Sequence, residues 1–161
     1  MQSSSLPAVA VLILGALAFS PPASAASKTD IAAMIKADVA EIVGGINAKD
    51  IAKATKFDAP DLVSMESMRE PSIGVDADKA GLSMAFKYSP QWHLGLIDET
   101  VDVSDSGEMA VYRSTYSEDS LNDGVPMTHK VNYIAGFRHD PDGVWRVHWS
   151  VVCAQSRSHK A

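Results

Sequence analysis

Residues 137–152 read FRHDPDGVWRVHWSVV, two runs of large residues at alternate positions on either side of a turn signal. Pro and Gly within Asp140-Pro141-Asp142-Gly143 favour a tight turn. The alternation on both sides is typical of β-strands that pair across such a turn. The stretch therefore predicts the last hairpin of an antiparallel sheet, with a final strand over residues 144–154.

The sequence just upstream shows the same pattern of strand-like runs separated by turn signals. Further strands are predicted over residues 92–103, 109–117 and 125–138, and turn signals at 105–107 and 122–124 separate them. These four long strands follow one another directly, so we expect an antiparallel meander.

The N-terminal half is helical instead. Apolar residues recur at steps of three and four from Ile31 to Ile46, which predicts an amphipathic helix that Gly44-Gly45 loosens at its end. Asn47 is the expected N-cap of a second, short helix that stops near Pro60, with Asp50 in its first turn.

A short first strand is predicted over residues 62–65. Asp76 is then expected to cap a third helix, which Pro90 ends. Helices with one short strand, followed by a meander, predict an α+β fold in which the helices lie on one face of the sheet.

Composition limits the class of protein. The chain has 161 residues, enough for one domain, and a net charge of −6, which argues against a nucleic-acid partner. Cys153 is the only cysteine, so no disulfide can form within the chain. Packing or dimerisation must hold the fold together.

The first 25 residues predict export. Residues 8–19 form an apolar block that is short for a membrane span, and the first charged side chain is Lys28. Ala23-Ser24-Ala25 matches the small-x-small pattern of a signal-peptidase site. We expect a signal peptide at residues 1–25, a periplasmic or secreted domain, and no stable membrane span after cleavage.

Two segments carry a family resemblance: NAKDIAKATKFDAPDLVSME, residues 47–66, and FRHDPDGVWRVHWSVV. With the helix-then-hairpin order, they resemble the SnoaL-like and ketosteroid-isomerase-like branch of the nuclear transport factor 2-like superfamily. The resemblance covers a domain at residues 28–156 and leaves a tail at 157–161. It implies a cystatin-like α+β cone, in which a curved sheet wraps around helices and encloses an apolar pocket, and a dimer formed by the outer sheet face.

The best-known activity of that branch is not expected. The resemblance places Ile42 and Ala135 where ketosteroid isomerases have their two acidic hydrogen-bond donors, and Met65 or Glu66 where they have the general base. Without the donors a dienolate is not stabilised. The Asp-Arg-Asp arrangement of limonene-epoxide hydrolases is absent too.

Side chains alternate between the two faces of a strand. If Ala135 faces inward, as its family counterpart does, His129 and Tyr133 share that face. On the last strand the predicted inward set is Arg146, His148, Ser150 and Val152. The predicted outward set is Trp145, Val147, Trp149 and Val151, an apolar face that favours a covered or homodimeric sheet.

A carboxylate and a histidine that converge in an apolar cavity are the minimum set for moving protons. We expect Glu66 and His148 to be the catalytic pair, with His129 and Tyr133 as helpers. The expected ligand-binding residues are Tyr88, Trp92, Tyr112 and Ser150. The alternative is that both histidines are structural strand residues and that Glu66 is a solvated strand end.

A metal site built from His93, His129 and His148 is a weaker alternative, because no closely spaced ligand pair supports it. We therefore expect neither a metal nor a cofactor. The leading hypothesis is an exported pocket protein, a cofactor-free lyase or isomerase for a small hydrophobic or aromatic compound. A non-catalytic ligand-binding module and a partner-docking module are the alternatives.

Overall fold

The computed structural model describes residues 26–67, 69–122 and 125–155. The predicted signal peptide and the tail at 157–161 lie outside these ranges. The helices are α1 (Lys28–Ala48), α2 (Ile51–Ala54) and α3 (Val75–Tyr88). The strands are β1 (Asp58–Glu66), β2 (Ser72–Ile73), β3 (His93–Val103), β4 (Met109–Asn122), β5 (Val125–His139) and β6 (Trp145–Ala154). Among the described helices, none has both the length and the apolar character needed to cross a membrane.

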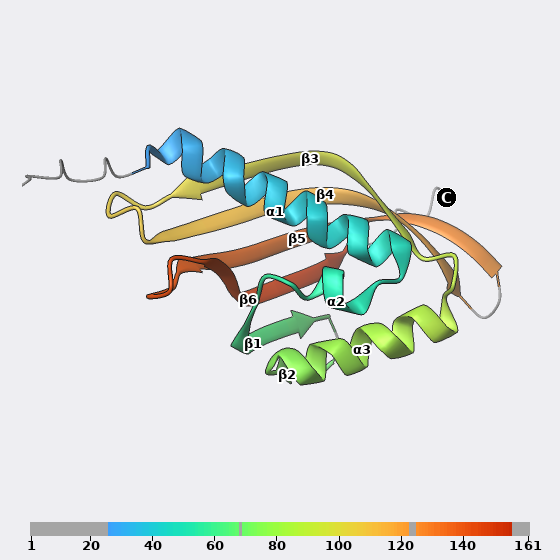
Figure 1. The fold of residues 1–161 in the computed structure, drawn as a ribbon. Helices are drawn as coiled ribbons and strands as arrows, with labels where there is room; N and C mark the ends of the chain where they lie inside the picture. Colours follow the sequence, from blue (N-terminus) through green and yellow to red (C-terminus); the bar gives the residue numbers. More distant parts are fainter. Residues whose placement is uncertain (1–25, 68, 123–124, 156–161) are drawn as a thin grey trace, which may run out of the picture.

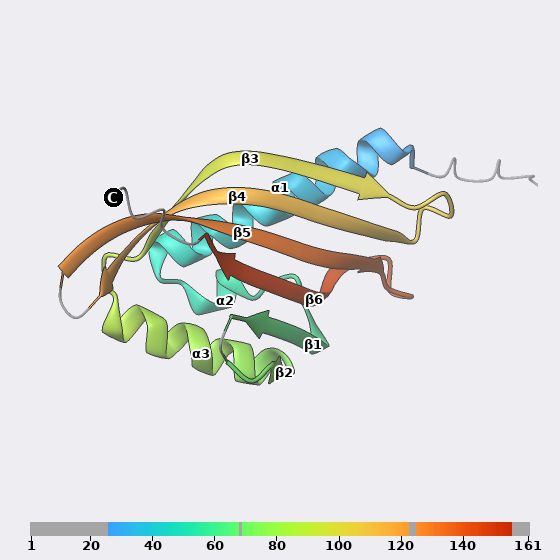
Figure 2. The same ribbon diagram turned by 180° about the vertical axis from the view of Figure 1, so that it is seen from behind.

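The strands form one sheet in the order β2-β1-β6-β5-β4-β3. All neighbours are antiparallel except β1 and β6, which are parallel. Helix α1 lies across one face of the sheet and α3 lies beside β1 and β2 (Figure 1). The view from behind shows the opposite sheet face without a helix over it (Figure 2). The predicted α+β class and the meander from β3 to β6 are confirmed.

Helix α1 begins with a capping box. The Ser27 hydroxyl accepts a hydrogen bond from the backbone of Asp30, and the Asp30 carboxylate accepts one from the backbone of Ser27. The apolar stripe predicted from the sequence then packs on the sheet through Ile31, Ile35 and Val39, which are all buried.

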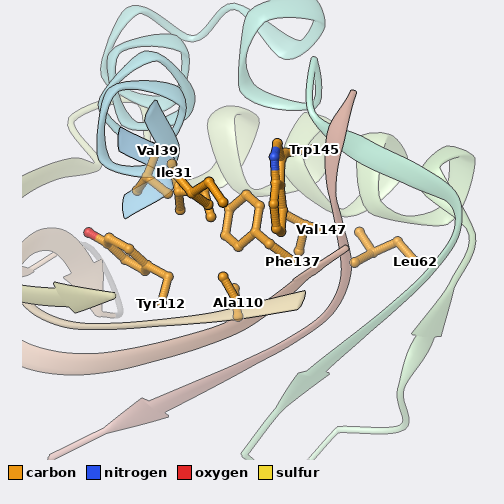
Figure 3. Packing of buried hydrophobic residues seen from close by; sticks show 10 residues of the cluster. Ile31, Val39, Leu62, Ala110, Tyr112, Phe137, Trp145 and Val147 are labelled. Carbon is orange, nitrogen blue, oxygen red and sulfur yellow. The ribbon is translucent and has the colours of Figure 1, made fainter. Parts of the chain in front are cut away.

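The stripe meets a core provided by the strands, which Figure 3 shows from close by. The buried members of this cluster from β1, β4, β5 and β6 are Leu62, Ala110, Tyr112, Ala135, Phe137, Trp145 and Val147. Burial of these apolar side chains is the main favourable term for the fold, and the single cysteine allows no disulfide within the chain to add to it.

The glycine pair in α1 has a different role from the one predicted. The helix does not loosen at Gly44-Gly45 but continues to Ala48, and it ends at Lys49, which adopts the left-handed conformation. Gly45 is where α2 packs directly against α1: a Cβ there would lie 2.4 Å from the backbone nitrogen of Ala54. The missing side chain allows the two helices to approach closely.

The predicted helix caps are also corrected. Asp50, not Asn47, caps α2, since its carboxylate accepts a hydrogen bond from the Lys53 backbone. Asn47 instead binds both backbone groups of Leu94, with its amide donating at 3.0 Å and its carbonyl accepting at 2.8 Å. This side chain ties the end of α1 to the start of β3.

Strand β6 departs from simple alternation. Gly136 pairs with Trp149 while Phe137 pairs with Val147, so His148 is an extra residue in a bulge. As a result, the residues of β6 before the bulge and those after it alternate with opposite parity between the two sheet faces. The prediction that Trp145 and Val147 face outward is therefore wrong for this half of the strand, because both are buried in the core.

The two glycines of α1 offer a paired test. We expect Gly45→Ala to destabilise the fold by about 1–3 kcal/mol, since the added methyl would meet the backbone of α2. Gly44→Ala should stabilise it by about 0.5–1 kcal/mol through helix propensity, because its nearest new neighbour is the mobile end of the Lys53 side chain at 3.6 Å. Urea denaturation measures both. Equal effects of the two substitutions would contradict the close approach of the helices.

Candidate functional site

A cavity of about 620 Å³ lies between the helices and the curved sheet. Its apolar wall comes from α1, α3 and the strands. The principal apolar side chains are Val39, Ile42, Val43, Ile46, Leu62, Leu82, Ala85, Leu94, Val131, Val147 and Val152. This volume is within the range of small-molecule sites.

Polar side chains enter the same cavity from several elements. The carboxylates are Asp58 and Glu66 from β1, Asp78 from α3 and Glu118 from β4. His129, Tyr133 and Ser150 also line it. Of these residues, the sequence pattern identified Glu66, His129, Tyr133 and Ser150, and it missed Asp58, Asp78 and Glu118.

Asp58 is the most perturbed acid of the cavity. It stands at the start of β1, and its Oδ2 atom is buried with no hydrogen-bond partner among the described residues. Burial raises the pKa of this carboxyl to about 7, and repulsion from Asp78 adds to the effect while Lys79 opposes it. Asp58 can therefore gain or lose a proton near neutral pH.

Asp78 comes from the first turn of α3. Burial raises its pKa, and the charge of Glu66 raises it further. In the sequence this aspartate is indistinguishable from a residue that only favours the helix dipole. Its position in the cavity depends on α3 packing against β1, which brings it near Asp58.

Glu118 and His129 are direct cross-strand partners on β4 and β5. The Glu118 Oε1 and His129 Nε2 atoms are 3.7 Å apart, and both side chains are largely buried. Burial raises the pKa of Glu118, although the positive charge available on His129 acts in the opposite direction. His129 Nδ1 is buried and unpaired within the described ranges.

Tyr133 supplies a hydroxyl near the aspartates. Burial, followed by the nearby charge of Asp58, raises the pKa of this phenol, so the hydroxyl stays protonated at physiological pH. Ser150 is a hydrogen-bonding neighbour of Tyr133 and donates to Ser64 at 3.2 Å. The predicted inward positions of Tyr133 and Ser150 are confirmed.

The other predicted residues divide between cavity and core. Glu66 lines the cavity but is half exposed and pairs with Arg69 at 2.8 Å. Tyr88 and Trp92 also line the cavity. Tyr112 does not belong to its lining. It is fully buried in the core, where its hydroxyl lies 2.8 Å from the Tyr116 hydroxyl and donates to Glu99.

The predicted inward position of His148 is wrong. The bulge turns its ring away from the cavity, where Nε2 lies 3.0 Å from Asp140 and Nδ1 lies 3.2 Å from Asp61. Arg146 turns the same way and pairs with Asp140 and Asp142. The expected convergence of Glu66 and His148 does not form.

The three histidines of the weaker metal hypothesis do not converge. His93 is exposed at the start of β3, His129 is in the cavity and His148 is outside it. Across the described ranges, no group of three or more His, Cys, Asp or Glu side chains is arranged to hold a metal ion.

No family model and no curated protein sequence matches this chain. Solved structures do. A ketosteroid isomerase-like protein from Erwinia carotovora atroseptica is 21% identical, with 78% of this chain and 96% of that chain covered and a TM-score of 0.63. An NTF2-like protein of unknown function from Pseudomonas putida is 17% identical, with 82% and 92% covered and a TM-score of 0.71.

A third structure is a candidate dehydratase of the NTF2-like family from Streptomyces avermitilis. It is 13% identical, with 81% of this chain and 100% of that chain covered and a TM-score of 0.70. The chain has the nuclear transport factor 2-like fold, a cystatin-like α+β architecture. Proteins with this fold include both enzymes and proteins of unknown function, so activity must be argued from the cavity.

Within this NTF2-like fold, two positions bear on the activity of the isomerase branch. Ile42 lines the cavity, and Ala135 is completely buried in the core. Both are the hydrocarbon side chains that the sequence resemblance placed at the donor positions. The polar side chains that this cavity does present include its four carboxylates, His129, Tyr133 and Ser150.

The raised pKa of Asp58 predicts how stability depends on pH. Folded Asp58 keeps its proton up to pH about 7, whereas the unfolded carboxyl loses it near 3.8, so this group makes the fold less stable as pH rises between these values. We expect Asp58→Asn to reduce the fall in unfolding free energy by about 1.4 kcal/mol per pH unit in this window. Urea denaturation from pH 4 to 8 measures the change.

The matched control is Asp98→Asn, an aspartate on β3 that is exposed and does not line the cavity. It should leave the pH dependence between 4 and 7 essentially as in the unmodified chain. A parallel shift of both variants, with no change of slope for Asp58→Asn, would contradict the burial of a protonated carboxyl at Asp58.

Proposed function

We propose that this chain is a cofactor-free acid–base catalyst of the lyase or isomerase type that acts on a small molecule with a largely apolar body. The observation that carries the proposal is the meeting of Asp58 and Tyr133 in one cavity with apolar walls. A base that ionises near the working pH and a neutral hydroxyl donor are what proton transfer at carbon requires.

In this proposal the ionised Asp58 removes a proton from carbon next to a carbonyl or leaving group. The Tyr133 hydroxyl donates a hydrogen bond to the oxygen on which negative charge develops. Asp78 acts on Asp58 through its charge, because it raises the pKa of that carboxyl toward neutrality. The apolar walls exclude water, which strengthens each of these interactions.

Glu118 and His129 form a second proton-transfer group within the same cavity. If Glu118 accepts the Nε2 proton of His129, the lone pair on Nδ1 is left free to accept a proton from the ligand. They take the place of the predicted Glu66 and His148 pair, since His148 lies outside the cavity.

The setting of this activity is also part of the proposal. The predicted signal peptide supports a periplasmic or secreted enzyme. The helix-free sheet face, with Ile134 exposed and Trp149 and Val151 partly so, supports a homodimer through this face (Figure 2).

Proton abstraction can be tested before the natural substrate is known. Incubation of the purified chain in D₂O with a panel of cyclic and aromatic ketones should place deuterium at the carbon next to the carbonyl, detected by NMR. The rate should rise with pH through about 7, because the ionised carboxylate of Asp58 is the base. Asp58→Asn should lower it by about 10²- to 10⁴-fold.

Two further variants make the experiment decisive. Tyr133→Phe should lower the exchange rate by about 10²-fold through loss of a donor, and Asp98→Asn should leave it unchanged. Exchange that is equally fast in Asp58→Asn and in the unmodified chain would overturn the role of Asp58. A cavity that binds ketones but never exchanges protons would favour the non-catalytic binding module.

A further inference from the structure

We propose that the ligand of this cavity carries a positively charged ammonium group on its apolar body. The inference rests on the proposed function only in taking the cavity as the ligand site. It adds the charge and the chemical class of the molecule, and three features of the wall support it: the charge balance, the aromatic rings and an unpaired oxygen.

Acidic side chains outnumber basic ones in the wall of the cavity. Four carboxylates line the cavity, whereas the one Arg or Lys among its described lining residues is Arg69. Arg69 is held by Glu66 at 2.8 Å. Lys79 acts on Asp58 from outside the lining. An anionic ligand would therefore be repelled by the wall of the cavity, while a cation would be attracted.

The aromatic residues give a second and independent indication. Tyr88, Trp92, Tyr116 and Tyr133 all line the cavity. Their ring faces attract an ammonium group, and this effect is larger in a cavity that excludes water. Aromatic rings combined with carboxylates are the chemistry by which proteins recognise alkylammonium ions, whereas a neutral apolar ligand would need only the rings.

The third feature is Asp58 itself. Its Oδ2 atom is buried and finds no hydrogen-bond donor elsewhere in the described chain. Leaving a carboxylate oxygen unpaired in an apolar environment is costly, and a charge-assisted bond from a ligand would relieve that cost. Asp78 is close enough to raise the pKa of Asp58, so one cation can interact with both carboxylates.

The test uses three probes that differ in charge: phenethylammonium, its uncharged isostere propylbenzene, and phenylpropanoate. Titration calorimetry, with tryptophan fluorescence as a second signal, measures their dissociation constants for the purified full chain at pH 7. We expect the ammonium probe to bind at least about tenfold more tightly than the isostere and the carboxylate to bind weakest. Its binding should release protons near pH 6.5, because the cation favours ionised Asp58.

Substitutions of the cavity aspartates test whether they are the source of the preference for the ammonium probe. Asp58→Asn and Asp78→Asn should each weaken the ammonium probe by about tenfold and leave the affinity for the uncharged isostere unchanged, which shows that the cavity is still formed. Asp98→Asn, outside the cavity, should change neither affinity. Equal losses for the charged and uncharged probes would contradict a charge-specific role for either aspartate.

The outcomes separate this inference from the proposed function. An isostere or a carboxylate that binds as tightly as the ammonium probe overturns the inference and leaves the acid–base proposal intact. If none of the three probes binds while deuterium exchange proceeds, the inference again fails and the proposed function stands. Tight ammonium binding without any deuterium exchange supports the inference and overturns the catalytic role.

Discussion

The bulge at His148 is the constraint on which the rest of the structure depends. It allows β6 to bury Trp145 and Val147 in the core and, after one extra residue, to direct Ser150 and Val152 into the cavity. A regular strand would send one of these two sets into solvent. Beside the bulge, the Trp149 indole packs directly on Gly136, where a Cβ would come within 2.1 Å of the ring, so this position requires glycine.

Core and cavity share the same inner sheet face, and the division between them follows from side-chain size and polarity. Toward one end of β5, Phe137 fills the space beneath α1 as part of the core. Toward the other end, Tyr133 and His129 face open volume instead. The hydrocarbon packing at one end supplies the stability that lets the other end keep buried polar groups, each of which costs free energy without a partner.

Periodicity predicted the parts of this fold that depend on local sequence. The α1 stripe and the hairpin order follow from repeats of 3.6 or 2 residues and from turn signals. The inward positions of Tyr133 and Ser150 follow from alternation once the family resemblance places Ala135 inward. The orientation of His148 was not predicted because a single inserted residue reverses the alternation of faces along the strand. The feature that accompanies the bulge is the packing of Trp149 on Gly136, and this is a tertiary contact that the local sequence does not reveal. The contact of Asn47 with Leu94 was not predicted, because a side-chain amide that can cap a helix can equally bind the backbone of a neighbouring strand.

The acidic character of the cavity arises from tertiary packing in the same way. Asp58 and Asp78 are twenty positions apart, one at a strand start and one in a first helical turn, where each is common for local reasons. Only the contact of α3 with β1 brings them together and removes water from both. The chain tolerates this repulsion within a fold that has no disulfide to support it. Buried carboxylates whose pKa values are raised by burial and by a neighbouring charge cluster at functional sites, and this is the support that Asp58 and Asp78 give to the proposed role of the cavity.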